Sequence, residues 1–148
     1  MIILPEIILS IGFLILLCVS PFLKTNAHKH IGYFSLLLIF VTQFSIVKDI
    51  FIFEEVFEGF FIIDSFGSFL KLIILISAGL VLFFYLIVKN DKSLNRSEFP
   101  LVVLISLIGM MFMVSANNLL SLFVSIELQS LALYILVSFS KEDLNSSE

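Results

Sequence analysis

The chain has 148 residues, of which 60% are apolar and 14% are charged, and its formal net charge is −4 at pH 7. A soluble domain carries about 25% charged residues, and the apolar residues of this chain lie in runs long enough to cross a bilayer. The composition therefore excludes a water-soluble protein. The small negative charge and the absence of a basic motif give no support to nucleic-acid binding, and a single cysteine, Cys18, excludes an internal disulfide framework.

The apolar runs predict an all-α integral membrane protein, with one membrane domain over residues 1–148. The first run could be mistaken for a signal peptide. However, the residues before it include Glu6 and no Lys or Arg, and no small-residue cleavage site follows it. We therefore expect a retained helix, with Pro5 in its first turn. The five predicted transmembrane helices cover approximately residues 4–23, 31–47, 66–88, 100–114 and 119–139.

The connection at residues 48–65 differs from the others. Aromatic, β-branched and acidic residues alternate along it, and Gly59 lies inside it. This pattern predicts a short β-hairpin or an amphipathic surface loop. A very tight turn at residues 115–118 joins the fourth and fifth spans, and a polar tail begins at Ser140.

The loop charges predict the orientation of the helices. With five spans, the first loop, the third loop and the C-terminal tail share one side and hold six basic residues, whereas the other side holds only Lys48. We therefore expect the C-terminus to face the matrix or cytoplasm and the acidic connection 48–65 to face outward. The six basic residues are Lys24, Lys29, Lys89, Lys92, Arg96 and Lys141.

Glu127 lies near the middle of the fifth span. A charged residue at that depth costs a few kcal/mol on insertion scales, so such residues tend to face protein or water and to be functional. A buried carboxyl group of this kind can take up and release protons. The structural alternative is a protonated side chain that only forms a hydrogen bond with a neighbouring helix.

Helical spacing of about 100° per residue gives the fifth span two polar faces. Ser130, Tyr134 and Ser138 share the face of Glu127. Because lipid satisfies no polar group, this helix must be enclosed by others, and five helices can hardly surround one of their own members. We infer that further helices come from another chain, whereas the first span can face lipid. The opposite polar face holds Asn118, Ser121, Ser125 and Gln129.

Lys71 is the second charged residue within a span. It lies near the outer end of the third span, where its long side chain could reach water or take part in charge coupling. Asp64 lies seven residues earlier, too far along the helix for direct pairing. His28 and His30 could in principle bind a metal, but no cysteine or acidic ligand lies beside them, and a solvated loop is the simpler interpretation.

The chain resembles, over its whole length and most specifically in its last forty residues, the antiporter-like subunits of proton-pumping NADH:ubiquinone oxidoreductase, respiratory complex I. The similarity is greatest to subunit 2, called subunit N in bacteria. The matching residues are the segment Gly109–Leu120, Phe123, Glu127-Leu128, Ser130-Leu131 and Tyr134, together with Leu4–Ile7, Asp64–Phe66, Phe69 and Lys71.

The resemblance implies that Glu127 matches a fifth-helix glutamate that pairs with a lysine on a later, broken helix and contributes to proton translocation coupled to ubiquinone reduction. Members of that family have many more than five helices. The resemblance therefore implies the N-terminal product of a split subunit, completed by a second chain and bound to other membrane-arm subunits and lipids. It also implies that this chain binds no cofactor, since NADH, FMN, the iron–sulfur clusters and ubiquinone belong to other subunits.

The composition, with 18 Phe and no Trp, is typical of an AT-rich genome such as that of an organelle. With the resemblance, it implies a mitochondrial inner-membrane protein whose N-terminus faces the intermembrane space and whose C-terminus faces the matrix. Two alternatives remain open: a subunit of a multi-chain sodium/proton antiporter, and a small membrane scaffold or assembly factor without a proton role.

Overall fold

The computed structural model describes residues 4–22, 27–48, 53–87 and 98–144, with the side chains of 27–28 and 139–144 left out. In these ranges, five helices are long and apolar enough to cross a bilayer, and two short strands pair. The predicted all-α membrane fold with a small hairpin is therefore confirmed. The elements in chain order are α1 (Leu4–Val19), the 3₁₀ turn η1 (Ser20–Phe22), α2 (Ala27–Lys48), β1 (Glu54–Val56), β2 (Phe61–Ile63), α3 (Ser65–Ile87), α4 (Glu98–Ser115) and α5 (Leu119–Leu144).

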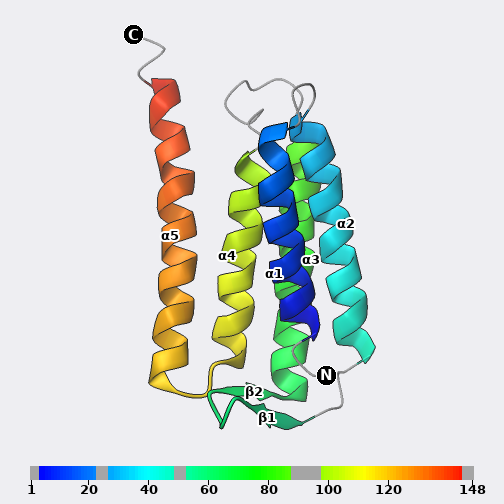
Figure 1. Cartoon of the computed structure of the whole chain (residues 1–148), viewed down its shortest axis with the longest axis vertical. Coiled ribbons are helices and arrows are strands. Elements are labelled where there is room, and N and C mark those ends of the chain that lie inside the picture. Colours follow the sequence, from blue (N-terminus) through cyan, green and yellow to red (C-terminus); the bar gives the residue numbers. More distant parts are fainter. Residues whose placement is uncertain (1–3, 23–26, 49–52, 88–97, 145–148) are drawn as a thin grey trace.

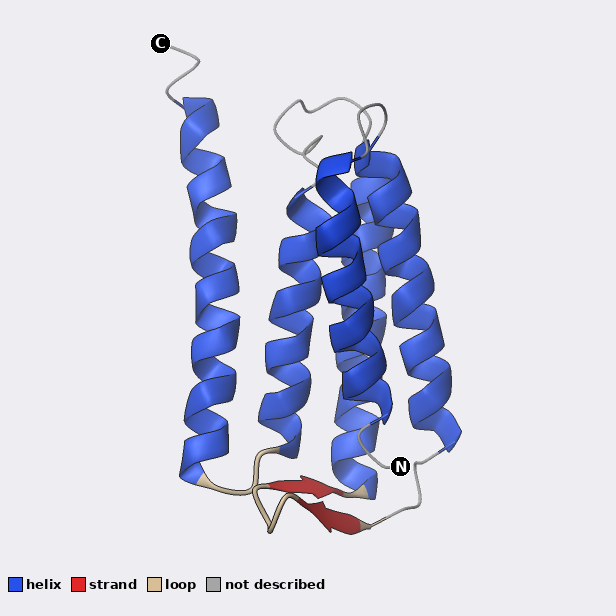
Figure 2. Ribbon diagram, in the orientation of Figure 1, coloured by secondary structure: helices blue, strands red, loops and turns tan. Residues whose placement is uncertain are grey.

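The helices alternate in direction, and α4 is central among them (Figure 1). It packs against α1, α2 and α3 on one side and against α5 on the other. Its side chains Leu104, Leu107 and Met111 have no exposed surface. The bundle core is therefore formed by α1, α2, α3 and α4 together, and α5 lies beside this group of four helices (Figure 2).

The outer faces of α1 and α2 are apolar, and Ile11, Ile15, Phe40 and Phe44 are exposed there. Large apolar side chains gathered on one surface mark contact with a membrane or a partner. This is the surface predicted for a first helix that faces lipid.

The hairpin β1–β2 is antiparallel, with Glu54 opposite Ile63. Its turn passes through Phe57, Glu58 and Gly59, which have φ angles of 54°, 54° and 85°. Such left-handed conformations are uncommon for residues other than glycine, so Gly59 takes the most extreme of the three at no steric cost. Because the hairpin lies at the end where α1, α3 and α5 begin (Figure 1), the predicted grouping of these elements at one end is confirmed.

α2, α4 and α5 extend beyond the predicted apolar spans, and α1 ends at Val19, before a 3₁₀ turn that continues to Phe22. α2 begins at Ala27, inside the predicted first loop, α4 begins at Glu98, and α5 continues to Leu144. Hydropathy locates the apolar part of a segment, whereas the backbone hydrogen bonds of a helix continue through polar residues. The membrane-spanning parts of the helices, Leu4–Phe22, Lys29–Lys48, Ser65–Ile87, Glu98–Ser115 and Leu119–Ser138, agree with the predicted spans to within two residues.

Candidate functional site

The first turn of α5 is held by its own cap and by the hairpin. The side-chain oxygen of Asn118 accepts a hydrogen bond from the backbone N–H of Ser121 at 2.9 Å. In return, the hydroxyl oxygen of Ser121 accepts a hydrogen bond from the backbone N–H of Asn118, with 3.4 Å between nitrogen and oxygen. This reciprocal arrangement satisfies N–H groups that have no partner within the helix. The Ser121 hydroxyl also donates to the carbonyl of Phe60 at 3.0 Å. The start of α5 is thus fixed relative to the hairpin.

Asn117 adds two further bonds between the hairpin and the α4–α5 turn. Its backbone N–H donates to the carbonyl of Phe60 at 3.0 Å, and its amide Nδ2 donates to the carbonyl of Gly59 at 2.8 Å. Backbone groups of the tight turn therefore have partners at a membrane end, where an unpaired group would be costly.

α5 packs closely against α4 at Gly109. A Cβ atom added to Gly109 would lie 2.9 Å from the backbone nitrogen of Gln129 and 3.2 Å from its Cα atom. Small residues permit such close approach between membrane helices. Ser121 and Ser125 are buried on this side, and the Ser125 hydroxyl donates to the carbonyl of Ser121 at 2.7 Å. One of the two predicted polar faces of α5 is therefore the face that packs on α4.

Glu127 lies on the other side of α5 and is exposed. Its carboxylate has no hydrogen-bond or ion-pair partner among the described residues. It lies about 12 Å along the helix from Leu119, within the candidate span Leu119–Ser138. The structure therefore places an acidic side chain mid-span, on a face that the described part of the chain leaves uncovered.

The predicted neighbours of Glu127 share that open face but do not contact its carboxylate. The Ser130 hydroxyl donates to the backbone carbonyl of Glu127 at 3.0 Å, and Tyr134 is 69% exposed. The expectation that helices enclose α5 is met only on the side of α4. The helices described here cannot supply the other side.

A shallow groove of about 280 Å³ lies over α4 between α3 and α5. Its lining is apolar apart from Ser77 on α3 and Ser106 on α4. This groove continues the uncovered surface beside α5.

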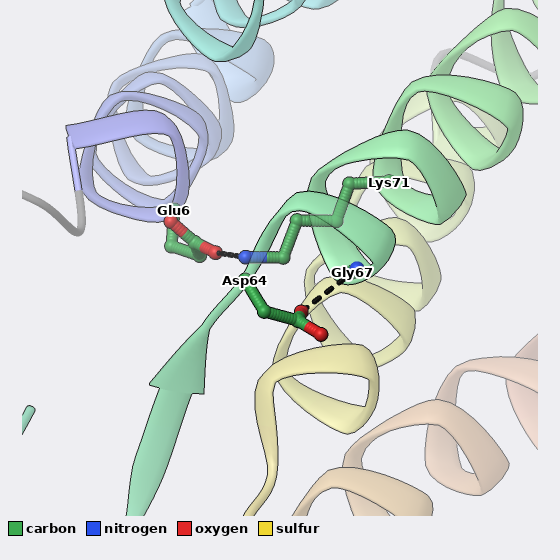
Figure 3. Close-up of polar contacts among 4 residues, drawn as sticks. All are labelled: Glu6, Asp64, Gly67 and Lys71. Atoms are coloured by element: carbon green, nitrogen blue, oxygen red, sulfur yellow. Dashed lines mark hydrogen bonds and ion pairs between the residues drawn. The ribbon is translucent and has the colours of Figure 1, made fainter. Parts of the chain in front are cut away.

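Lys71 is not exposed to solvent; the structure places it inside the bundle. Its ammonium forms an ion pair with the carboxylate of Glu6 at 2.5 Å, and each residue is only 4% exposed. Figure 3 shows the Lys71 side chain running from α3 toward Glu6 on α1. The interpretation that Lys71 reaches water was therefore wrong, because a carboxylate within the protein is its partner.

Sequence reasoning missed Glu6 as a site residue. An acidic residue in the first turn of a helix is commonplace, because it complements the helix dipole, and this ordinary explanation concealed its role. The available signal was the presence of one acidic and one basic residue near the same end of two apolar helices. The prediction that Asp64 does not pair with Lys71 is confirmed. The Asp64 carboxylate instead accepts a hydrogen bond from the Gly67 N–H at 2.8 Å at the start of α3.

The weaker candidates lie away from these groups. Cys18 is exposed on α1, and His30 is exposed near the start of α2. The side chain of His28 lies outside the described residues, as do the loop residues Lys24, Lys89, Lys92 and Arg96 and the side chain of Lys141.

Searches against known proteins give one consistent result. The chain is 33% identical to NADH-quinone oxidoreductase subunit N of Parvibaculum lavamentivorans, 36% to that of Rhodospirillum rubrum and 38% to that of Rhizorhabdus wittichii. These alignments cover 98%, 98% and 97% of the chain, but only 30% of each relative. No family model matches the chain. The chain thus spans about a third of the length of the relatives that it resembles throughout.

Proposed function

Because the chain belongs to the NADH-quinone oxidoreductase subunit N family, we propose that it is a membrane-arm component of a proton-pumping NADH:quinone oxidoreductase. In this proposal Glu127 takes up and releases protons during quinone reduction. NADH, flavin, iron–sulfur clusters and quinone are bound by other subunits, and the isolated chain catalyses no reaction.

One observation carries the proposal: a carboxylate lies mid-span on the uncovered face of α5. Leaving a charged group against lipid is costly, by about 2.5–3.5 kcal/mol on insertion scales. A covering surface with a cation and hydrogen-bond donors would remove that cost and would provide proton exchange partners. The side chains of Ser130 and Tyr134 extend this polar strip along the same face.

The rest of the subunit provides the covering surface. The chain accounts for 30% of the length of its relatives, so most of a subunit N lies beyond the matched part. We propose that helices from this remainder, on the same polypeptide or on a second one, pack over α5 and the groove beside it. They include at least one lysine within reach of Glu127.

The three relatives named above are bacterial, so the similarity does not favour a mitochondrial membrane over a bacterial one. The predicted mitochondrial inner membrane, with the C-terminus in the matrix, remains a proposal that rests on composition and loop charges.

Co-purification from native membranes tests the proposed assembly. Recovery of the chain with flavin and iron–sulfur subunits supports it, recovery with antiporter subunits supports the sodium/proton alternative, and recovery with neither supports a scaffold.

Glu127→Gln tests the proton role. Proton translocation should fall about tenfold or more while the complex still assembles, because the amide keeps the shape of the side chain but cannot ionise. Glu98→Gln, at an exposed glutamate in the first turn of α4, is the matched control and should behave as wild type. Normal pumping by a fully assembled Glu127→Gln complex would contradict the proposal.

A further inference from the structure

The Glu6–Lys71 ion pair links two helices inside the bundle. Glu6 is in the first turn of α1, and Lys71 is the seventh residue of α3. Both side chains are at least nine-tenths buried, so the pair is shielded from the lipid-facing surface.

Stability alone does not account for such a pair. Burying two charges costs several kcal/mol for each ion, and well-packed apolar side chains often hold two helices together equally well. In a membrane helix, a buried ionisable residue is by default a functional candidate.

A second feature points to an incoming proton or hydrogen-bond donor. Lys71 donates its hydrogen bond to Oε1 of Glu6, and Oε2 is buried with no hydrogen-bond partner among the described residues. Asp64, the nearby acidic group drawn in Figure 3, bonds instead to the N–H of Gly67. One acceptor oxygen of the pair is therefore left open within the bundle.

The pair lies closer to the hairpin end of the bundle than Glu127 does. α3 and α5 both begin at the hairpin end (Figure 1). Lys71 is about 9 Å along α3, and Glu127 is about 12 Å along α5. α4 separates the two sites and packs on both α1 and α5.

We propose that the Glu6–Lys71 pair is a second protonatable site, which accepts a proton at Glu6 Oε2. This inference rests on the proposed function. A hydronium ion from water at the hairpin end gives up one O–H bond, and an O–H bond forms at Oε2, which leaves water and a neutral carboxylic acid. Lys71 keeps its charge but loses the counter-charge beside it. Release of the proton to water restores the carboxylate and the ion pair.

Paired substitutions in the assembled complex test the proposal. The apolar pair Glu6→Leu/Lys71→Met removes both charges without leaving either one unpaired. We expect it to lower proton translocation about tenfold or more in complexes that still assemble. Normal translocation by the assembled apolar pair would show that the ion pair only holds α1 to α3, and would overturn the proposal.

A second measurement applies even if the apolar pair fails to assemble. Glu6→Asp and Lys71→Arg each keep a buried ion pair, so a merely structural role predicts the wild-type pH profile of translocation. The proposal predicts a displaced profile for Glu6→Asp, and an unchanged profile would overturn it.

Glu127→Gln, measured in parallel, separates this inference from the proposed function. Loss of pumping in Glu127→Gln with normal pumping and profiles in the ion-pair variants would remove the inference alone. Normal behaviour of all these variants would remove both.

Discussion

The ammonium of Lys71 and the carboxylate of Glu6, 65 residues apart in the sequence, form a buried ion pair between α3 and α1. α1 packs mainly on α2 and α4, so this pair fixes α1 relative to α3 near the hairpin end. The charge of each side chain offsets part of the free-energy cost of burying the other. This mutual dependence can be measured.

We predict that Lys71→Met destabilises the subunit by about 3–5 kcal/mol, because it leaves the Glu6 carboxylate buried without its partner. Glu6→Leu in the same chain should recover most of that loss. A double-mutant cycle on thermal unfolding in detergent measures the coupling. Additive effects of the two substitutions would show that the ion pair does not form.

We predict that Gly109→Ala displaces α5 from α4, because its Cβ atom would lie 2.9 Å from the backbone nitrogen of Gln129. Backbone atoms cannot rotate away, and overpacking of this kind costs about 1–3 kcal/mol. The amount of assembled complex on native gels should fall. Gly79→Ala is the matched control in α3, since its Cβ atom would meet only a side-chain methyl of Ile39 at 3.9 Å. Equal assembly of the two variants would contradict the close packing at Gly109.

We predict that Asn118→Ala destabilises the start of α5 by about 1 kcal/mol, because it removes the acceptor for the Ser121 N–H. Asn118→Asp keeps an acceptor at the same place and should remain close to wild type. The midpoint of thermal unfolding reports the difference. Equal midpoints for the alanine and aspartate variants would show that this cap contributes little.

We predict that the hairpin faces the outer side of the membrane. Since Cys18 is the only cysteine, a Cys18→Ala chain provides a background for single reporters. Glu55→Cys, on the exposed side of the hairpin, should react with a membrane-impermeant thiol reagent added outside. Ser147→Cys in the C-terminal tail should react only after the membrane is opened. The reverse pattern would invert the proposed orientation.

The main elements could be predicted because each one has a local pattern. Apolar runs predict the spans, and alternating residues around Gly59 predict the hairpin. The position of Glu127 within its span follows from the same counting. The two polar faces of α5 follow from helical periodicity, although which of them packs on α4 depends on the close approach at Gly109.

The partner of Lys71 could not be predicted in the same way. Pairing with Glu6 requires α1 and α3 to pack at matching depths, and neither the local spacing nor the hydropathy of either helix determines this. The sequence around Lys71 offers only Asp64 and water as neighbours for its ammonium group, whereas tertiary packing provides the carboxylate of Glu6. The full lengths of α2 and α5 could not be predicted from hydropathy either, because helical hydrogen bonding continues beyond the apolar residues.

A density map of the native assembly around α5 tests the central claim most directly. We predict that protein helices cover the face of Glu127 and bring a lysine ammonium within about 4–6 Å of its carboxylate, the range in which an opposite charge favours ionisation. Lipid chains against Glu127, with no basic side chain beside it, would contradict the account.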